Sequence, residues 1–269
     1  MDEKISVKNL HFSYGEKEIL NGINLAVHKN EIFCLLGANG SGKTTLIDAI
    51  LGINRYKTGS ITVDSVEISS MKPSEIAKII AYVPQLHTIT FPYTVLEAVM
   101  MGRLASRGLF GEPKKEDELI CLEALSRVGI IDFKDRPYSR LSGGELKLVL
   151  LARALAQRTN VIIMDEPTAH LDIRNELVFL ETMTTVVSNE GLTVVMATHS
   201  LNHAFYFESL GVDVRAGIMK DGVLKYVGTP KETVTKETIK DAYNIDADII
   251  EKTKENGEVE RIVYPNNTI

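Results

Sequence analysis

The stretch "IFCLLGANGSGKTTLIDAI" at residues 32–50 joins a short apolar run to a glycine-rich loop and then to a helical pattern. Its central part, "GANGSGKTT" at 37–45, has Gly, four residues, Gly, Lys and Thr in the spacing of a phosphate-binding loop. Glycines allow the backbone amides to face an anion, and the dipole of the following helix adds positive potential. Strand, loop and helix together predict an α/β phosphate-loop fold that binds a nucleotide.

Side chains in and beyond this loop indicate the chemistry. We expect Lys43 to reach the β and γ phosphates and Thr44 to offer its hydroxyl to Mg²⁺. A second apolar run, "VIIMDEP" at 161–167, presents two carboxylates, of which Asp165 suits the metal and Glu166 suits the attacking water as a base. The pattern therefore predicts hydrolysis of a nucleoside triphosphate. The other loop residues expected around the phosphates are Gly37, Ala38, Asn39, Gly40, Ser41, Gly42 and Thr45.

Strand and helix patterns alternate along the chain, which is typical of an α/β fold with a mixed central sheet. Residues 4–14 alternate apolar and polar side chains and 19–27 continue with β-rich character, so we expect an N-terminal antiparallel β subdomain. Short apolar runs predict buried central strands at 32–37, 79–83, 161–165 and 193–198. Helical patterns lie at 43–52, 115–128, 143–157 and 173–190.

Two further regions differ in character from the central sheet. Residues 86–158 carry mostly helix signals, with Gly108 and Gly111 in loops, and predict a helical subdomain inserted between two strands. The tail from 229 to 269 predicts a capped helix and then two short strands joined at "ENGE", residues 255–258. We therefore expect a nucleotide-binding domain over residues 1–228 and a small α/β appendage after it.

Composition narrows the class of partner. The 269 residues carry a net charge of −6 and interspersed charges, which gives no basic block for a nucleic-acid backbone. Cys34 and Cys121 are far apart and suggest free thiols in a reducing compartment, with the cytoplasm fitting best. No apolar run reaches the roughly 18 to 20 residues that cross a bilayer, and the acidic start is unlike a signal peptide. We expect any membrane role to be peripheral.

A second glycine-rich turn, "LSGGE" at 141–145, precedes an apolar helix. Ser142 and Glu145 have the spacing of a capping box, which would account for these two residues. The two glycines between them cost roughly 1 kcal/mol each relative to Ala in a helix, so we expect another group to approach this backbone closely. An anion at the helix N-terminus is the natural candidate.

Four more side chains are weaker candidates when taken alone. Gln85 and His199 each follow a predicted strand, at the sheet edge where α/β proteins bind ligands, but either could be a hydrogen-bonded structural residue. Tyr14 could stack on a base or pack at an edge. His203 lies four residues after His199, but no third ligand is in view, so a zinc site is not expected.

Six features occur in this order along the chain: "GANGSGKTT", Gln85, "LSGGE", "VIIMDEP", "AHLD" at 169–172 and His199. Together they resemble the ATP-binding subunit of an ABC transporter, over residues 4–228. The resemblance implies ATP and Mg²⁺ as ligands and a head-to-tail dimer, in which each ATP lies between the phosphate loop of one copy and the "LSGG" turn of the other. It implies that Ser142, Gly143 and Gly144 address the partner's γ-phosphate and that Glu166 is the catalytic base. It also implies that His199 is the switch residue that contacts the γ-phosphate and that Gln85 couples the metal site to the membrane partner. Asp172 would communicate across the dimer, and Tyr14 would stack on adenine.

One residue of the signature departs from the family. Glu145 stands where Gln is more usual, and both fit the capping box. A carboxylate near a bound phosphate is mildly repulsive, so the sequence leaves the effect of Glu145 on ATP affinity open.

A narrower resemblance is to the ATPases of importers for chelated iron, siderophores, haem and cobalamin. It rests on "VPQLHTITFPYTVLEAVMMGR" at 83–103, "EPTAHLD" at 166–172 and the tail from 228. It implies a subunit at the cytoplasmic face of the membrane that powers uptake through a separate permease, supplied indirectly by a substrate-binding protein. The ATPase of an exporter and a soluble ABC ATPase acting in translation or DNA repair stay as alternatives, although the latter normally has two cassettes or a long coiled coil.

Overall fold

The computed structural model describes residues 2–85, 92–107, 112–253 and 259–269, which form two compact units. The first unit combines residues 1–71 with 193–269, and the second comprises 72–192. Gly108, Gly111, the "ENGE" turn and residues 86–91 of the stretch quoted at 83–103 lie outside the described residues.

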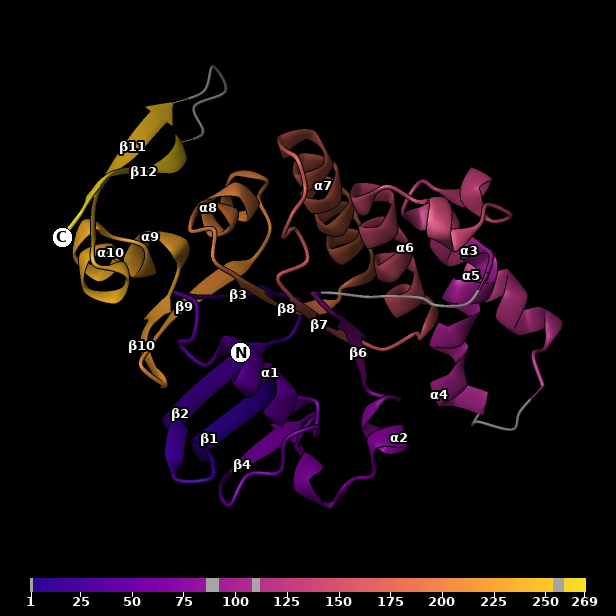
Figure 1. Cartoon of the computed structure of the whole chain (residues 1–269), viewed down its shortest axis with the longest axis horizontal. Coiled ribbons are helices and arrows are strands. Elements are labelled where there is room, and N and C mark those ends of the chain that lie inside the picture. Colours follow the sequence, from indigo (N-terminus) through magenta and orange to yellow (C-terminus); the bar gives the residue numbers. More distant parts are fainter. Residues whose placement is uncertain (1, 86–91, 108–111, 254–258) are drawn as a thin grey trace. The chain divides into compact units, whose positions relative to one another are not determined.

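An antiparallel sheet begins the first unit, as predicted (Figure 1). Val7 pairs with Leu25 on one side and with Ile61 on the other, and all three are buried. Apolar side chains of the first strand, Val7 among them, thus contribute to the core of this sheet. Its order is β2-β1-β4-β5, with bounds Lys17–His28, Glu3–Tyr14, Thr58–Val63 and Val66–Glu67. A short 3-10 turn, η1, follows at Ile68–Ser70.

A mixed sheet carries the phosphate loop in the same unit. Strand β3 (Ile32–Gly37) is buried along its whole length and runs parallel to β8 (Thr193–Thr198) and β9 (Val214–Lys220). Strand β10 (Val223–Gly228) then pairs antiparallel with β9, which makes the sheet mixed as expected. The helices joined to these strands are α1 (Lys43–Ile50) and α8 (Asn202–Ser209).

The tail contains one more helix than the sequence predicted. Thr229 caps α9 (Pro230–Thr233), Val234 leaves helical geometry, and Thr235 caps a new helix, α10 (Lys236–Tyr243). Two Thr capping boxes in succession divide what looked like one helix into two. The expected pair of strands follows as an antiparallel hairpin, β11 (Ile245–Thr253) and β12 (Val259–Thr268).

The second unit is mainly helical. Strands β6 (Ile80–Val83) and β7 (Val161–Asp165) pair in parallel, and the described residues between them form helices and one isolated bridge, Thr94 with Pro137. Gly102 lies so close to α6 that an added Cβ would be 2.3 Å from the Arg153 carbonyl oxygen. The helices are α2 (Pro73–Ile76), α3 (Val95–Met100), α4 (Leu104–Arg107), α5 (Lys115–Arg127), α6 (Gly143–Ala156) and α7 (Ile173–Glu190), with 3-10 turns η2 (Met101–Arg103), η3 (Ile131–Phe133) and η4 (Tyr138–Arg140).

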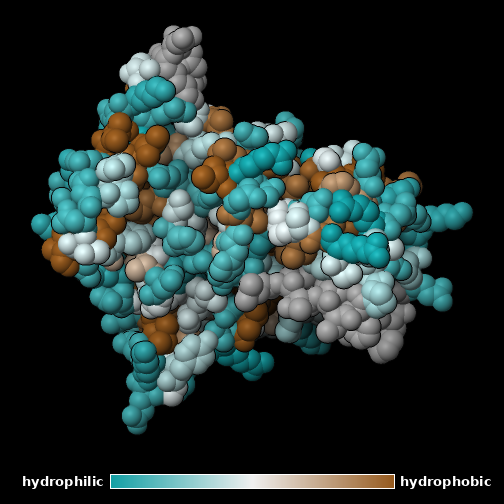
Figure 2. Space-filling model, turned by 45° about the horizontal axis from the view of Figure 1, so that its top comes forward, coloured by the Kyte–Doolittle hydropathy of each residue, from teal (hydrophilic) through white to brown (hydrophobic). Residues whose placement is uncertain are grey.

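One face of the molecule is mostly hydrophilic (Figure 2). Figure 2 shows hydrophilic residues over most of the face in view, with hydrophobic residues gathered in separate small groups. Within the described parts of the chain, no helix has the length and apolar character needed to span a membrane.

Candidate nucleotide site

The phosphate loop lies between β3 and α1. Gly37, Gly40 and Gly42 all have positive φ, at 153°, 79° and 105°. A Cβ at Gly37 would lie 2.6 Å from the Ser41 hydroxyl oxygen and 2.7 Å from the Met219 carbonyl oxygen, whereas a Cβ at Gly40 would meet nothing within 4 Å. The loop therefore needs glycine for its own curvature, and it leaves open space at its tip.

Polar groups of the loop fit a phosphate ligand. The Lys43 ammonium is buried and donates to the carbonyls of Gly37 and Ala38, at 2.7 and 3.2 Å. The Ser41 hydroxyl is buried without a hydrogen bond to the described residues. Helix α1 begins after Gly42 with no side-chain cap and no acidic residue in its first turn. An anion at this helix N-terminus would meet amides, a hydroxyl and an ammonium group.

The β9–β10 hairpin supports the loop, which the sequence had not revealed. Its turn residue Gly222 donates its amide to the Ser41 carbonyl at 3.1 Å and accepts from Asn21 at 2.9 Å. Asp221 and Gly222 both have positive φ, the geometry of a tight hairpin turn for which Asp-Gly is a strong signal. The dipeptide within "MKDGVL" could have placed this hairpin in advance.

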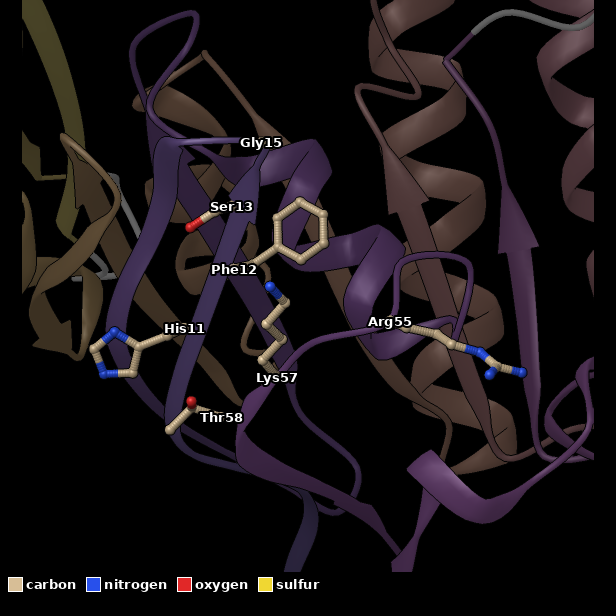
Figure 3. Close-up of a pocket in the computed structure, with 7 residues that line it drawn as sticks. All are labelled: His11, Phe12, Ser13, Gly15, Arg55, Lys57 and Thr58. Carbon is tan, nitrogen blue, oxygen red and sulfur yellow. The ribbon is translucent and has the colours of Figure 1, made fainter.

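Tyr14 ends β1, and its two chain neighbours, Ser13 and Gly15, line a cavity of the first unit (Figure 3). Tyr14 is 55% exposed, its ring packs edge-on against Phe12, and its hydroxyl accepts a hydrogen bond from Asn54 at 3.0 Å. A half-exposed ring held on one edge leaves area for a flat ligand to stack on. The cavity, of about 210 Å³, is lined by His11, Phe12, Ser13, Gly15, Arg55, Lys57 and Thr58.

The two histidines after β8 differ in setting. His199 directly follows the strand and is exposed. His203 is buried, and its Nδ1 lies 2.9 Å from the Thr198 hydroxyl. His203 therefore secures the end of β8, while His199 is the one presented at the surface.

In the second unit the structure brings Gln85 and Glu166 together. The Gln85 side-chain amide donates to the Glu166 carboxylate at 3.1 Å. Glu166 has a positive φ of 43°, an uncommon conformation for a residue other than glycine, and Asp165 before it is buried at the end of β7. A third residue joins them: the Lys147 ammonium donates to the Gln85 carbonyl oxygen at 2.6 Å. Burial lowers the pKa of Lys147, and the Asp165 carboxylate opposes that change.

The capping box predicted for α6 is confirmed. The Ser142 amide donates to the Glu145 carboxylate at 2.8 Å, and the Glu145 amide donates to the Ser142 hydroxyl at 3.4 Å. Arg136 also donates to Glu145, at 2.9 Å. The Ser142 amide first and the Arg136 guanidinium besides hold the pKa of Glu145 below its usual range. The carboxylate that departs from the family thus has its charge offset within the chain.

The structure accounts differently for the two glycines of the signature turn, Gly143 and Gly144. A Cβ at Gly144 would lie 2.6 Å from Cγ of Asn175, so a side chain of the same unit requires this glycine. Asn175 in turn donates its side-chain amide to Asp172, which caps α7 by accepting from the Asn175 backbone at 2.8 Å. Gly143 is exposed, and a Cβ there would meet only Leu171, at 3.7 Å. Gly143, and not Gly144, therefore leaves space that an approaching ligand could fill.

Each unit holds part of the predicted site. The first contains the phosphate loop with Thr44 and Thr45 at the start of α1, as well as Tyr14 and His199. The second contains Gln85, Asp165, Glu166 and Asp172, together with the turn that includes Ser142. A phosphate loop between a buried strand and a helix, with a carboxylate pair ending another strand, defines a phosphate-loop nucleotide hydrolase.

Comparison with known proteins gives the family. The sequence profile described as ABC transporter matches residues 20–169, more than half of the chain. The iron(3+)-hydroxamate import ATP-binding protein FhuC of Bacillus subtilis is 32% identical over 94% of this chain and 92% of its own. The petrobactin import ATP-binding protein FpuC of Bacillus anthracis is 33% identical over 92% of this chain and 89% of its own. The chain belongs to the ABC transporter family, as an ATP-binding, ATP-hydrolysing cassette.

A solved structure extends the match over the tail. A protein described as a metal-chelate type ABC transporter in an inward-facing conformation aligns with a TM-score of 0.85 and 28% identity, covering 98% of both chains. Cassettes of this family work as dimers with membrane permease partners.

The Glu145–Arg136 pair gives a pH-dependent prediction. Glu145→Gln keeps an acceptor for the cap but loses the ion pair, so the free energy of unfolding should fall by up to about 1 kcal/mol at pH 7. Because the folded-state pKa of Glu145 is lowered, its contribution is complete above the unfolded pKa, about 4.3, and is lost as pH falls through the folded value. Urea unfolding of the two proteins should therefore converge toward pH 4 and below. Glu112→Gln, at an exposed position of the same unit, serves as the control. If the free energies of unfolding of Glu145→Gln and the unaltered chain differ by the same amount at every pH, the prediction is wrong.

Proposed function

We propose that this chain is the ATPase subunit of an importer for a metal chelate, of the siderophore, haem or cobalamin type. The observation that carries the proposal is the extent of the match to the metal-chelate transporter structure, which covers 98% of this chain and so takes in the appendage as well as the cassette. Two relatives named for import of iron–hydroxamate and petrobactin support it over 94% and 92% of the chain. We assign residues 1–228 to the cassette, with 86–158 as its helical subdomain, and 229–269 to the appendage.

ATP would bind first to the phosphate loop. Lys43 exchanges its contacts with the Gly37 and Ala38 carbonyls for the β and γ phosphates, and the amides from Ala38 to Thr45 surround them. The exposed ring of Tyr14 stacks on adenine. Thr44, Gln85 and Asp165 are the oxygen-bearing residues that would hold Mg²⁺, an ion that prefers oxygen ligands. When bound, Mg²⁺ neutralises charge that develops on the transferred phosphoryl group.

Hydrolysis then depends on Glu166 as base. Its carboxylate, oriented by Gln85, accepts a proton from the attacking water, a step that typically contributes about 10²- to 10⁴-fold. His199, exposed after β8, contacts the γ-phosphate and reports its presence or loss. In the dimer, Ser142 and the open turn at Gly143 complete the partner's site, and Asp172 lies at the junction of the two copies.

The chain would work at the cytoplasmic face of the membrane. Two ATP molecules close the dimer, closure moves the attached permease subunits, and hydrolysis reopens it. A substrate-binding protein delivers the chelate to the permease on the opposite side of the membrane. The transported molecule therefore does not touch this subunit.

Reconstitution tests this proposal. The chain is purified with the membrane protein that accompanies it, placed in vesicles with ATP, and supplied with ferric hydroxamate, haem and cobalamin, each with a matching binding protein. Uptake of one chelate that depends on ATP and stops with Lys43→Ala is expected. ATP-dependent export, or co-purification with ribosomes or DNA in place of a permease, would overturn it.

A further inference from the structure

We propose that Lys147 is a positioning residue for ATP hydrolysis. Its ammonium holds the Gln85 backbone so that the Gln85 side chain is directed at the Glu166 carboxylate. This inference rests on the catalytic role proposed above for Glu166, and it adds a residue that lies outside the phosphate loop, the carboxylate pair and the signature turn.

The first link is the contact between Lys147 and the segment after β6. Lys147 is 6% exposed, and its ammonium donates to the Gln85 carbonyl oxygen at 2.6 Å and lies 3.5 Å from the Pro84 carbonyl oxygen. A buried ammonium group loses hydration, which costs several kcal/mol unless hydrogen bonds replace the lost water. The contacts with two consecutive carbonyls therefore fix both the lysine and the backbone of Gln85.

The second link runs from Gln85 to Glu166. These residues follow paired strands, since Val83 pairs with Met164 in the parallel β6–β7 ladder. The Gln85 amide donates to Glu166 at 3.1 Å, while the Glu166 carbonyl accepts from the Ala169 amide at 3.1 Å. Backbone and side chain of Glu166 are thus both held. The orientation of its carboxylate depends on where the Gln85 side chain points.

The third link is helix α6 itself. Ser142 caps the helix and Lys147 lies five residues further along it, a rise of about 7.5 Å. A capped α-helix moves as a rigid element, so displacement of the signature turn also displaces the lysine. Lys147 consequently joins the turn proposed to meet the partner's ATP to the base that acts on this copy's ATP. A nonpolar side chain at 147 would preserve the helix and remove that connection.

The full chain carrying Lys147→Met tests the inference by steady-state ATP hydrolysis. Because the phosphate loop is untouched, KM for ATP should stay within about twofold while kcat falls about 10- to 100-fold, the scale of a misplaced catalytic group. Lys115→Met, at an exposed position of the same unit, should have the KM and the kcat of the unaltered chain. A fall in kcat together with a large rise in KM, or no change in either, would overturn the inference.

A double-mutant cycle separates positioning from stability. If Lys147 acts through Gln85, then Lys147→Met should lower kcat in the unaltered chain and have no further effect on kcat when Gln85→Ala is already present. Its effect on the unfolding temperature should be the same in both backgrounds. Independent, multiplicative losses of kcat would assign Lys147 a structural role only.

Glu166→Gln distinguishes failure of this inference from failure of the catalytic proposal. If Glu166→Gln lacks activity and Lys147→Met has full activity, only the role of Lys147 is refuted. If Glu166→Gln hydrolyses ATP at the normal rate, the catalytic proposal fails and the inference with it.

Discussion

Replacing Glu166 by Gln is expected to lower kcat for ATP hydrolysis by about 10²- to 10⁴-fold while leaving ATP binding intact. The change is nearly isosteric, and the side-chain oxygen of the new residue can still accept from the Gln85 amide, which reaches Glu166 at 3.1 Å. What the variant loses is a group that can take a proton from water. ATP should therefore accumulate in a closed dimer, measurable by size-exclusion chromatography with ATP and by trapped radiolabelled nucleotide.

Two further variants show whether the loss of kcat is specific to Glu166. Glu181→Gln changes an exposed glutamate on α7 and should leave kcat unchanged. Lys43→Ala should instead fail to bind ATP tightly, since it removes the buried ammonium of the phosphate loop. Turnover by Glu166→Gln at the rate of the unaltered chain would remove Glu166 from the mechanism.

The sequence was most informative where local chemistry determines local structure. The phosphate loop, the Ser142–Glu145 cap and the helix at 173–190 depend on residues within a few positions of one another, and all have the predicted form. The division of the tail into α9 and α10 was missed because a helical period continues across Thr235, although that residue caps a new helix.

Contacts between distant segments could not be predicted in this way. Gly144 is required by Asn175, which lies 31 residues away in sequence on α7. Lys147 approaches Gln85 from a helix 62 residues later, and nothing in the pattern "LKLVLL" marks it as more than one polar residue on an apolar helix. The approach of α7 to the turn also changes how its glycines are interpreted, since only Gly143 keeps open space that a ligand could fill.

The strongest test of the proposed dimer combines Lys43→Ala and Ser142→Ala in two arrangements. If each ATP lies between one copy's phosphate loop and the other copy's signature turn, placing both changes on one chain damages both sites. Placing them on opposite chains confines both to one site and leaves the other intact. Loss of one pre-organised hydrogen-bond donor costs about 10²- to 10³-fold in comparable sites, so the two heterodimers should differ by about that factor.

The experiment uses heterodimers assembled with the permease and isolated through different affinity tags on the two chains. The arrangement with both changes on one chain is expected to be nearly inactive, and the opposite-chain arrangement to keep up to half of the normal activity. Because the two samples contain the same substitutions in the same number, loss of stability or of the α6 cap affects them equally. The reverse result, with more activity when both changes are on one chain, would mean that Ser142 serves only its own copy's nucleotide. Equal activities would mean that Ser142 contributes to neither site. In both cases the turn at Gly143 would have no role at the partner's nucleotide.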